Sequence, residues 1–406
     1  MVRLLNMDSK INLKINPNSI YFLLTSYLLA LVSIFQVAKA TIFEKNNFEF
    51  IDINPWAFTE LLINYEGGFV RRGFVGNLIF QIDSDGILFD TLYDIVFINF
   101  FVFVILILIN LDKSNLTSFQ KLLFHISIFA PFNITLFSNF VARKEIFIIN
   151  FYLLILLIFK TTNKKIFLFS CFFFSVLSIL IHEGITFFIY FPFLIYLMKK
   201  KNVQKKFITG FIYMMVFTFT IIILNKGNSQ IVNQIWSSLS SQDIVLINNL
   251  NPNAITAIGW GVIDTLKTTY VLVFSGSLIY WSVFFVMLVY TISVAFNDLI
   301  TETYLNLKTI LVSNKQFLLI LPLFIIGFDW GRWILTIFYL LFFTLLLEYK
   351  KNLNSLRLTY NLIFFTVISL LTELTPCCIA MEGTAVSSNY YRIFKSIELT
   401  ITQFLN

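Results

Sequence analysis

Four short charged motifs interrupt an otherwise apolar sequence, and their residue types suit anion binding and proton transfer. They are Asn64–Gly73 (NYEGGFVRRG), Arg143–Glu145 (RKE), His182–Gly184 (HEG) and Gly327–Trp333 (GFDWGRW). Carboxylates and histidine can accept a proton, and arginine suits two-pronged binding of phosphate or carboxylate. The motifs together predict a site that holds an anionic substrate and moves a proton.

The first motif supplies a carboxylate and two adjacent guanidinium groups. Gly67 and Gly68 let the backbone turn sharply and approach a ligand. We expect Glu66 to act as a catalytic base and Arg71 and Arg72 to clamp an anion. The alternative is an interfacial helix held by its own Glu–Arg pairs, although surface ion pairs contribute little on their own.

The second and third motifs add cations and a proton carrier. Arg143 and Lys144 are predicted to bind substrate, and the alternative is that they anchor a helix end as snorkelling cations. His182 and Glu183 are predicted to be catalytic, because a His-Glu pair within an apolar stretch is costly unless it lines a wet cavity. The alternative is a polar turn in a tight hairpin. No second histidine follows one turn later, so we expect no metal site.

The fourth motif places an acidic residue, a positively charged residue and an aromatic ring close together in the sequence. Asp329 and Arg332 are three apart and share a face if they are helical. Asp329 is predicted to be catalytic and Arg332 to bind substrate. Trp330 could stack on a sugar ring, and tryptophan also suits the membrane interface. A plain Asp–Arg pair at a helix end is the alternative.

The elements that must position these motifs are membrane-spanning helices. The chain has 406 residues, of which 58% are hydrophobic and only 13% charged, and its mean hydropathy is +0.83. A soluble domain has about 25% charged residues, so a soluble enzyme is excluded. The net charge of +7 does not indicate nucleic-acid binding, because basic residues in a membrane protein first encode orientation.

Apolar runs long enough to cross a bilayer predict an all-α, polytopic transmembrane bundle of about eleven spans. They are 19–38, 92–111, 119–140, 145–160, 165–181, 184–198, 207–225, 270–296, 315–327, 332–348 and 358–374. We expect a single membrane domain, 1–406, with outer loops at 39–91 and 226–269. The first of these loops is unusually long, as functional loops often are.

Lysine and arginine distribute oppositely over this topology. With a cytoplasmic N-terminus, 16 of the 22 lysines fall on the inner side and five of the seven arginines on the outer side. Lysines follow the positive-inside bias. A topology signal would use either cation, so the outer arginines predict a function, and all four motifs fall on the outer side.

A lipid-linked sugar fits such an outer face. Its pyrophosphate would lie against arginines, its lipid between helices and its glycan in the aqueous loops. Glycosyl transfer needs a base for the acceptor hydroxyl and cations for the leaving phosphate. Glu66 or His182 would be the base. No nucleotide-binding glycine motif is present in the sequence, and no cofactor is expected.

The long first outer loop with its acidic residue, followed by many apolar helices, resembles the GT-C class of polyprenyl-phosphate-dependent glycosyltransferases. The four motifs are similar to those of bacterial O-antigen and capsule polymerases of the Wzy type. The resemblance implies a bacterial inner-membrane enzyme that polymerises polyprenyl-pyrophosphate-linked repeat units at the extracytoplasmic face. It also implies a polysaccharide chain-length regulator as a partner. The outer loop lacks Arg and His over 227–266, which leaves a simpler GT-C transferase open.

Two other classes remain as alternatives. A lipid-linked oligosaccharide flippase or other transporter also carries intramembrane charges, usually with related halves and broken helices. An integral acyltransferase would use His182 as its base. Outer arginines favour a phosphate leaving group over the acyl chemistry.

Overall fold

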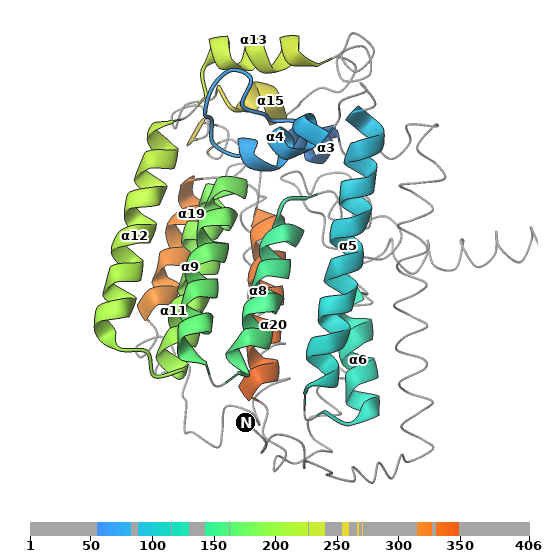
Figure 1. Cartoon of the computed structure of the whole chain (residues 1–406), viewed down its shortest axis with the longest axis vertical. Helices are drawn as coiled ribbons and strands as arrows, with labels where there is room; N and C mark the ends of the chain where they lie inside the picture. The colour runs from blue at the N-terminus through green and yellow to red at the C-terminus, as the bar shows by residue number, and fades with distance from the viewer. Residues whose placement is uncertain are drawn as a thin grey trace, which may run out of the picture.

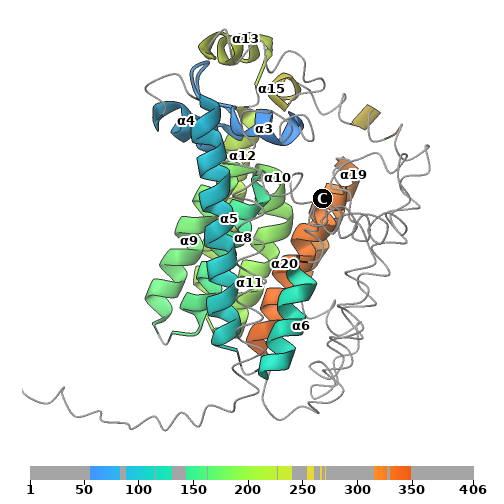
Figure 2. The same cartoon turned by 90° about the vertical axis from the view of Figure 1, so that its right-hand side faces the viewer.

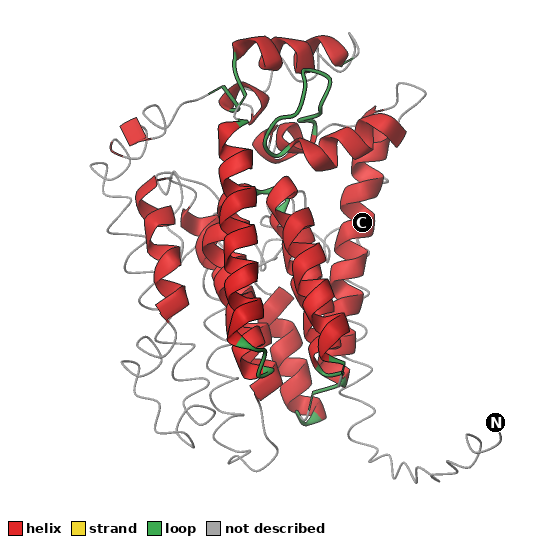
Figure 3. Ribbon diagram, turned by 60° about the vertical axis from the view of Figure 1, so that its left-hand side comes forward, coloured by secondary structure: helices red, strands yellow, loops and turns green. Residues whose placement is uncertain are grey.

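The computed structural model describes the middle of the chain in detail. The described residues are 55–82, 88–114, 116–129, 143–161, 163–225, 227–239, 254–259, 266–267, 270, 315–326 and 330–348. Within them every regular element is a helix, and Figure 3 shows helices and loops without a strand. The all-helical prediction is therefore confirmed for this part of the chain.

The helices follow the apolar runs of the sequence closely. In order they are α3 (Pro55–Leu61), α4 (Gly73–Ile82), α5 (Leu88–Asp112), α6 (Ser118–Phe129), α8 (Glu145–Phe159), α9 (Lys164–Ile181), α10 (Glu183–Ile185), the π-helix η4 (Thr186–Tyr190), α11 (Phe191–Lys200), α12 (Lys205–Leu224), α13 (Ser229–Ser238), α15 (Ala254–Ala257), the 3₁₀-helix η5 (Lys315–Ile320), α19 (Leu321–Ile326) and α20 (Trp330–Glu348).

The long helices form a bundle that is covered at one end by short ones. In Figure 1, α5, α8, α9, α11, α12 and α20 run along the long axis, with the α8–α9 and α11–α12 connections at the lower end. Figures 1 and 2 show α3, α4, α13 and α15 across the upper end. We call this upper layer the cap. The loops predicted at 39–91 and 226–269 supply it, as far as they are described.

Three helices are long and apolar enough to cross a membrane: Thr91–Asp112, Lys164–Ile181 and Lys205–Leu224, counted over the described residues. They correspond to the predicted spans 92–111, 165–181 and 207–225. Large apolar side chains point outward from them, including Phe169 at 68% and Phe217 at 67% exposure. Such surfaces suit lipid rather than water, and they indicate a membrane protein.

The other predicted spans have different outcomes. Run 145–160 forms the 15-residue helix α8, and runs 184–198 and 315–327 are interrupted where the helix type changes. Run 332–348 lies within α20, a continuous helix of 19 residues. Run 119–140 is helical as far as Phe129, beyond which it lies outside the described residues. Runs 19–38 and 358–374 lie outside the described residues, as does 270–296 apart from its first residue.

Buried amides join the helices at the centre of the bundle. The side chain of Asn150 on α8 donates to the carbonyl and side-chain oxygens of Asn99 on α5, at 2.9 and 2.8 Å. Further along the same pair, Asn110 donates to the Leu153 carbonyl at 3.3 Å. Hydrogen bonds between helices stabilise apolar bundles by about 0.6 kcal/mol each. They fix α5 against α8, whose first residues carry part of the charged cluster described below.

The cap is tied together by contacts between its two sequence segments. Ala254 N–H donates to the Thr59 hydroxyl at 2.9 Å, and the Asn64 amide donates to Ser238 Oγ at 3.0 Å. A Cβ on Gly76 would lie 2.1 Å from the Ile63 carbonyl oxygen. That position therefore requires glycine where α4 crosses the end of α3.

Candidate functional site

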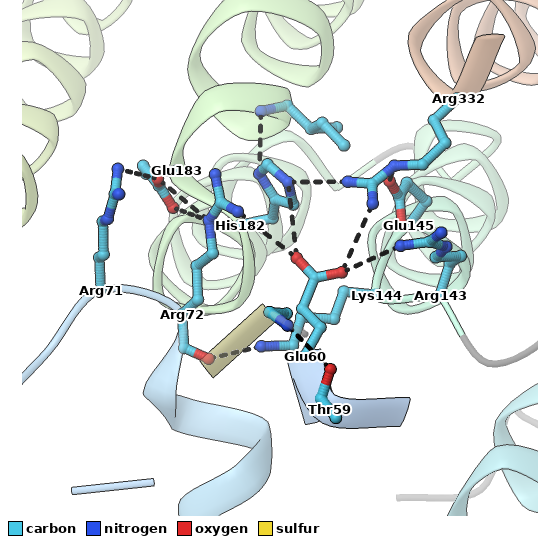
Figure 4. A network of polar contacts seen from close by, with 12 residues as sticks. Thr59, Glu60, Arg71, Arg72, Arg143, Lys144, Glu145, His182, Glu183 and Arg332 are labelled. Carbon is cyan, nitrogen blue, oxygen red and sulfur yellow. Dashed lines mark hydrogen bonds and ion pairs between the residues drawn. The ribbon is translucent and has the colours of Figure 1, made fainter. Parts of the chain in front are cut away.

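Nine charged or titratable side chains meet between the cap and the upper end of the bundle (Figure 4). We call them the charged cluster: Glu60, Arg71, Arg72, Arg143, Lys144, Glu145, His182, Glu183 and Arg332. They come from α3, the α3–α4 loop, the start of α8, the α9–α10 junction and α20. The topology thus gathers residues that lie up to 272 positions apart in the sequence.

Glu60 lies at the centre of the cluster and is fully buried. Its Oε1 is 3.6 Å from Arg72 Nη1 and 3.9 Å from His182 Nε2. Its Oε2 is 3.5 Å from Arg332 Nη1 and 3.7 Å from Arg143 Nη1. Burial opposes ionisation, but Arg332, Lys144, Arg72 and Arg143 together lower the pKa of Glu60 to about 2. Glu60 is therefore a carboxylate throughout the physiological range.

Glu183 forms a second centre, at the edge of the cluster that reaches solvent. Its carboxylate accepts from Arg72 Nε at 3.1 and 3.2 Å and from Arg71 Nη1 at 3.4 Å. The Arg71 and Arg72 side chains are 24% and 26% exposed. Burial would raise the pKa of Glu183, but Arg72 and Arg71 outweigh it and lower this pKa. Arg72 links the two centres because it contacts both Glu183 and Glu60.

Arg332 forms the inner wall of the cluster with no exposed side-chain surface. Its Nε lies 2.7 Å from Glu145 Oε1, and its Nη2 lies 3.2 Å from His182 Nε2. Arginine can only donate, so the latter contact is a hydrogen bond when His182 Nε2 carries no proton. Burial first, and then Arg72, Arg332, Lys144 and Arg71, lower the pKa of His182 well below its usual value. The imidazole is therefore neutral.

The backbone around His182 explains how it enters the cluster. His182 has an extended conformation, with φ −155° and ψ 98°, and separates α9 from α10. Its Nδ1 lies 3.4 Å from the Ile185 N–H. A neutral imidazole keeps one N–H, so it accepts from either Ile185 or Arg332 at one time. Both ring nitrogens face donors, which opposes binding of a second proton by the ring.

Lys144 joins the bundle to the loop that carries the two outer arginines. Its ammonium donates to the Arg72 carbonyl at 2.6 Å. Arg72 has φ 65°, a left-handed conformation that is uncommon for a large side chain. Burial lowers the pKa of Lys144 to about 8, and Arg72 adds to this while Glu60, Glu183 and Glu145 oppose it. Lys144 thus holds the strained turn and titrates just above neutral pH.

The cluster has more positive than negative charge. In their ordinary ionisation states, its five cations exceed its three carboxylates by two charges among the described residues. Arg143 and Lys144 directly precede α8, and Arg332 is the third residue of α20. Cations are unfavourable at helix N-termini, which already carry partial positive charge. The arrangement favours binding of an anion with about two charges.

The structure brings together seven of the ten predicted site residues. They are Arg71, Arg72, Arg143, Lys144, His182, Glu183 and Arg332. Glu66 is exposed, and among the described residues its side chain has no hydrogen bond or ion pair with the cluster. Trp330 begins α20, with its side chain outside the description, and Asp329 lies outside the described residues.

Sequence reasoning missed two residues. Glu145 belongs to the second motif but was not among the predicted site residues, and Glu60 was not considered. Glu60 lies in the segment PWAFTELL, where it is the one acidic residue among apolar neighbours. A lone carboxylate in such a segment is the signal that could have identified it, because burying an unpaired charge is costly.

The described residues contain no group of three or more His, Cys, Asp or Glu side chains arranged to hold a metal ion. The donors that the cluster presents are guanidinium and ammonium groups, which bind anions. Comparison of the chain with protein-family models, curated proteins and solved structures finds no match.

Proposed function

We propose that the protein is a membrane glycosyltransferase that acts on polyprenyl-pyrophosphate-linked saccharides and polymerises surface polysaccharide such as O-antigen or capsule. The observation that carries this proposal is the buried cluster, in which five cations exceed three carboxylates at one end of an apolar bundle. A pyrophosphate ester supplies the charge that this cluster lacks. Its polyprenyl chain suits the apolar outer surface of the helices.

The reaction transfers a glycan from its lipid carrier to a hydroxyl of an acceptor saccharide. The acceptor oxygen bonds to the anomeric carbon, its proton passes to a base, and the bond from that carbon to pyrophosphate breaks. The bond's electron pair leaves with the polyprenyl pyrophosphate. Cations that face the departing phosphate stabilise this charge in the transition state, and Arg71 and Arg72 are the partly exposed cations of the cluster.

The finer architecture is part of the same proposal. The chain would cross the bacterial inner membrane about eleven times in a GT-C-like bundle, with its N-terminus cytoplasmic and a long first extracytoplasmic loop. The cap would then face the extracytoplasmic side. Support comes from the lysines at the lower connections, including Lys160, Lys164 and Lys201, which match the positive-inside bias.

Single-cysteine labelling tests this orientation. Phe69 is an exposed cap residue and Lys205 is exposed at the lower end of the bundle. In a cysteine-free background, an impermeant maleimide applied to intact spheroplasts should label Phe69→Cys but not Lys205→Cys. The reverse pattern would invert the proposed orientation.

A flippase for the same lipid-linked substrate is the second candidate. Its support is the interruption between α9 and α11, where His182 breaks the helix and a π-helical turn follows. Discontinuous helices of this kind occur at the binding sites of secondary transporters.

Deletion of the gene, followed by gel analysis of surface polysaccharide, separates these candidates. Wild type and Arg71→Ala serve as complementing forms. A polymerase predicts loss of long chains while a single repeat unit is still displayed, with rescue by wild type alone. Loss of all repeat units would favour a flippase or an earlier transferase, and an unchanged ladder would contradict both.

A further inference from the structure

Glu60 differs from the other two carboxylates of the cluster in how closely it is held. Glu145 lies 2.7 Å from Arg332 Nε, and Glu183 lies 3.1 Å from Arg72 Nε. All four cluster contacts of Glu60 lie between 3.5 and 3.9 Å. Both Glu60 oxygens are buried without a hydrogen bond among the described residues, as are those of Glu145, but Glu60 also lacks a contact as close as the one between Glu145 and Arg332.

This geometry is unusual for a structural ion pair. Hydrogen bonds between charged groups normally measure about 2.7–2.9 Å, and a buried carboxylate without them loses hydration that nothing replaces. The surrounding charge nevertheless keeps Glu60 ionised, as its pKa of about 2 shows. Glu60 is therefore held by the field of the cluster rather than by specific bonds.

The groups around Glu60 converge from four parts of the fold. Arg72 comes from the cap, Arg143 from the start of α8, His182 from the α9–α10 junction and Arg332 from α20 (Figure 4). The pyrophosphate diester of the substrate is larger than a carboxylate and offers more oxygen acceptors, which suit the guanidinium fork. It can make the short bonds that the two Glu60 oxygens do not make.

We propose that Glu60 is the internal counter-anion of the charged cluster, and that a phosphate group of the substrate displaces its carboxylate. The inference rests on the proposed function, which supplies the pyrophosphate. It assigns the cations that face Glu60 to substrate binding, and it makes Glu60 a competitor of the anion rather than a base.

The location of Glu60 is compatible with such an exchange. It belongs to α3, a seven-residue helix of the cap that packs against α4 and α15. Arg143 lies just before α8, and Glu145 and Arg332 belong to α8 and α20 of the bundle. The carboxylate can therefore withdraw with a small shift in the cap, while Arg143 and Arg332 keep their places on the bundle.

Binding of inorganic pyrophosphate to the full chain in lipid nanodiscs, measured by calorimetry, tests the inference. The variants are Glu60→Gln, which removes the competing charge, and Glu60→Asp, which keeps the charge but shortens the side chain. Asp94→Asn is the matched control, because Asp94 is an exposed carboxylate of α5 outside the cluster. Arg71→Lys reports on the anion site itself.

We expect Glu60→Gln to bind pyrophosphate at least about tenfold more tightly than wild type, because the change removes a unit charge that lies close to three cations and competes with the anion for them. Glu60→Asp should bind with intermediate affinity and Asp94→Asn like wild type. Unchanged or weaker binding by both Glu60 variants, with wild type binding well, would overturn the inference alone. No binding by any form, Glu60→Gln included, would overturn the proposed anion site as well.

Discussion

The two ends of the helix bundle use positive charge in opposite ways. At the lower end, the half-buried Lys201 and the exposed Lys164 bind carbonyls near helix C-termini: Lys201 donates to Phe159 O at 2.5 Å and Lys164 to Asn202 O at 3.4 Å. Cations are favourable at helix C-termini and in water. At the capped end, Arg143 and Arg332 are buried at helix N-termini and face carboxylates.

This difference shows which end carries the unusual electrostatics. Solvent and the carbonyls at the C-terminal ends of α8 and α11 stabilise Lys164 and Lys201, so these lysines require no ligand. The charged cluster between the cap and the bundle has an excess of two positive charges that its three carboxylates do not balance. Natural sequences place such local conflicts at functional sites, and this contrast supports the capped end as the site of function.

The largest expected effect comes from removing a buried cation at the capped end. Arg332→Ala leaves Glu145 without its 2.7 Å partner and Glu60 without its nearest cation. Breaking a buried ion pair costs about 3–5 kcal/mol. Thermal unfolding of the detergent-solubilised protein should show this loss. Lys205→Ala at the lower end should shift stability by less than about 0.5 kcal/mol, and equal losses in both variants would contradict the comparison.

A charge-conserving change gives the next largest effect. Arg71→Lys keeps the positive charge but loses the planar fork that matches a phosphate. We expect complementation to fail at normal expression and the dissociation constant for pyrophosphate to rise about tenfold, the equivalent of about 1.4 kcal/mol. The reverse substitution at the lower end, Lys205→Arg, should change neither complementation nor the dissociation constant. Full activity of Arg71→Lys would exclude the clamp.

The pH dependence of anion binding tests the capped end separately, because Lys144 belongs to the charged cluster there. Lys144 is protonated below its pKa of about 8 and loses its charge above it. Its neighbours Glu60 and Glu183, whose pKa values are lowered by the nearby arginines, and Arg72, whose pKa is raised, keep their charges near this pH. Burial raises the pKa of Glu145. Affinity for pyrophosphate should therefore fall as pH rises from 7 to 9.5.

The expected decrease is about tenfold if an anion raises the pKa of Lys144 by one unit. Pyrophosphate itself titrates, so Lys144→Met provides the reference, and the ratio of the two affinities isolates the lysine. A ratio that is constant with pH would show that Lys144 keeps one protonation state.

The smallest effect is expected at Glu66. This residue is exposed and stands apart from the cluster, so Glu66→Gln should change pyrophosphate affinity by less than about twofold. The binding measurement described above applies. Loss of transfer activity in this variant with normal binding would support the catalytic role predicted from the sequence.

Much of this arrangement follows from the sequence because successive helices run in opposite directions along the bundle. Apolar runs predicted α5, α8, α9 and α12, and the charges between them identified which ends lie together. Arg71, Arg143, His182 and Arg332 were expected on one side and lie within one cluster. Their convergence required only that successive helices run in opposite directions.

Glu60 could not be found in the same way. Its burial depends on α3 packing against α15, which comes from a segment about 200 residues later. The Ala254–Thr59 hydrogen bond that fixes this contact has no periodic signal in the sequence. The pattern of spans likewise could not show that His182 interrupts a helix with an extended backbone rather than leaving the turn to Gly184.

Reconstituted transfer is the most direct test of the central claim that the capped cluster acts on a polyprenyl pyrophosphate. The purified protein in lipid vesicles is given polyprenyl-pyrophosphate-linked repeat units from the producing strain, and the products are separated by glycan chain length. We predict lengthened glycans with release of free polyprenyl pyrophosphate, and neither product with Arg71→Lys. Unchanged repeat units in the presence of folded wild-type protein, or equal products from Arg71→Lys, would contradict the account.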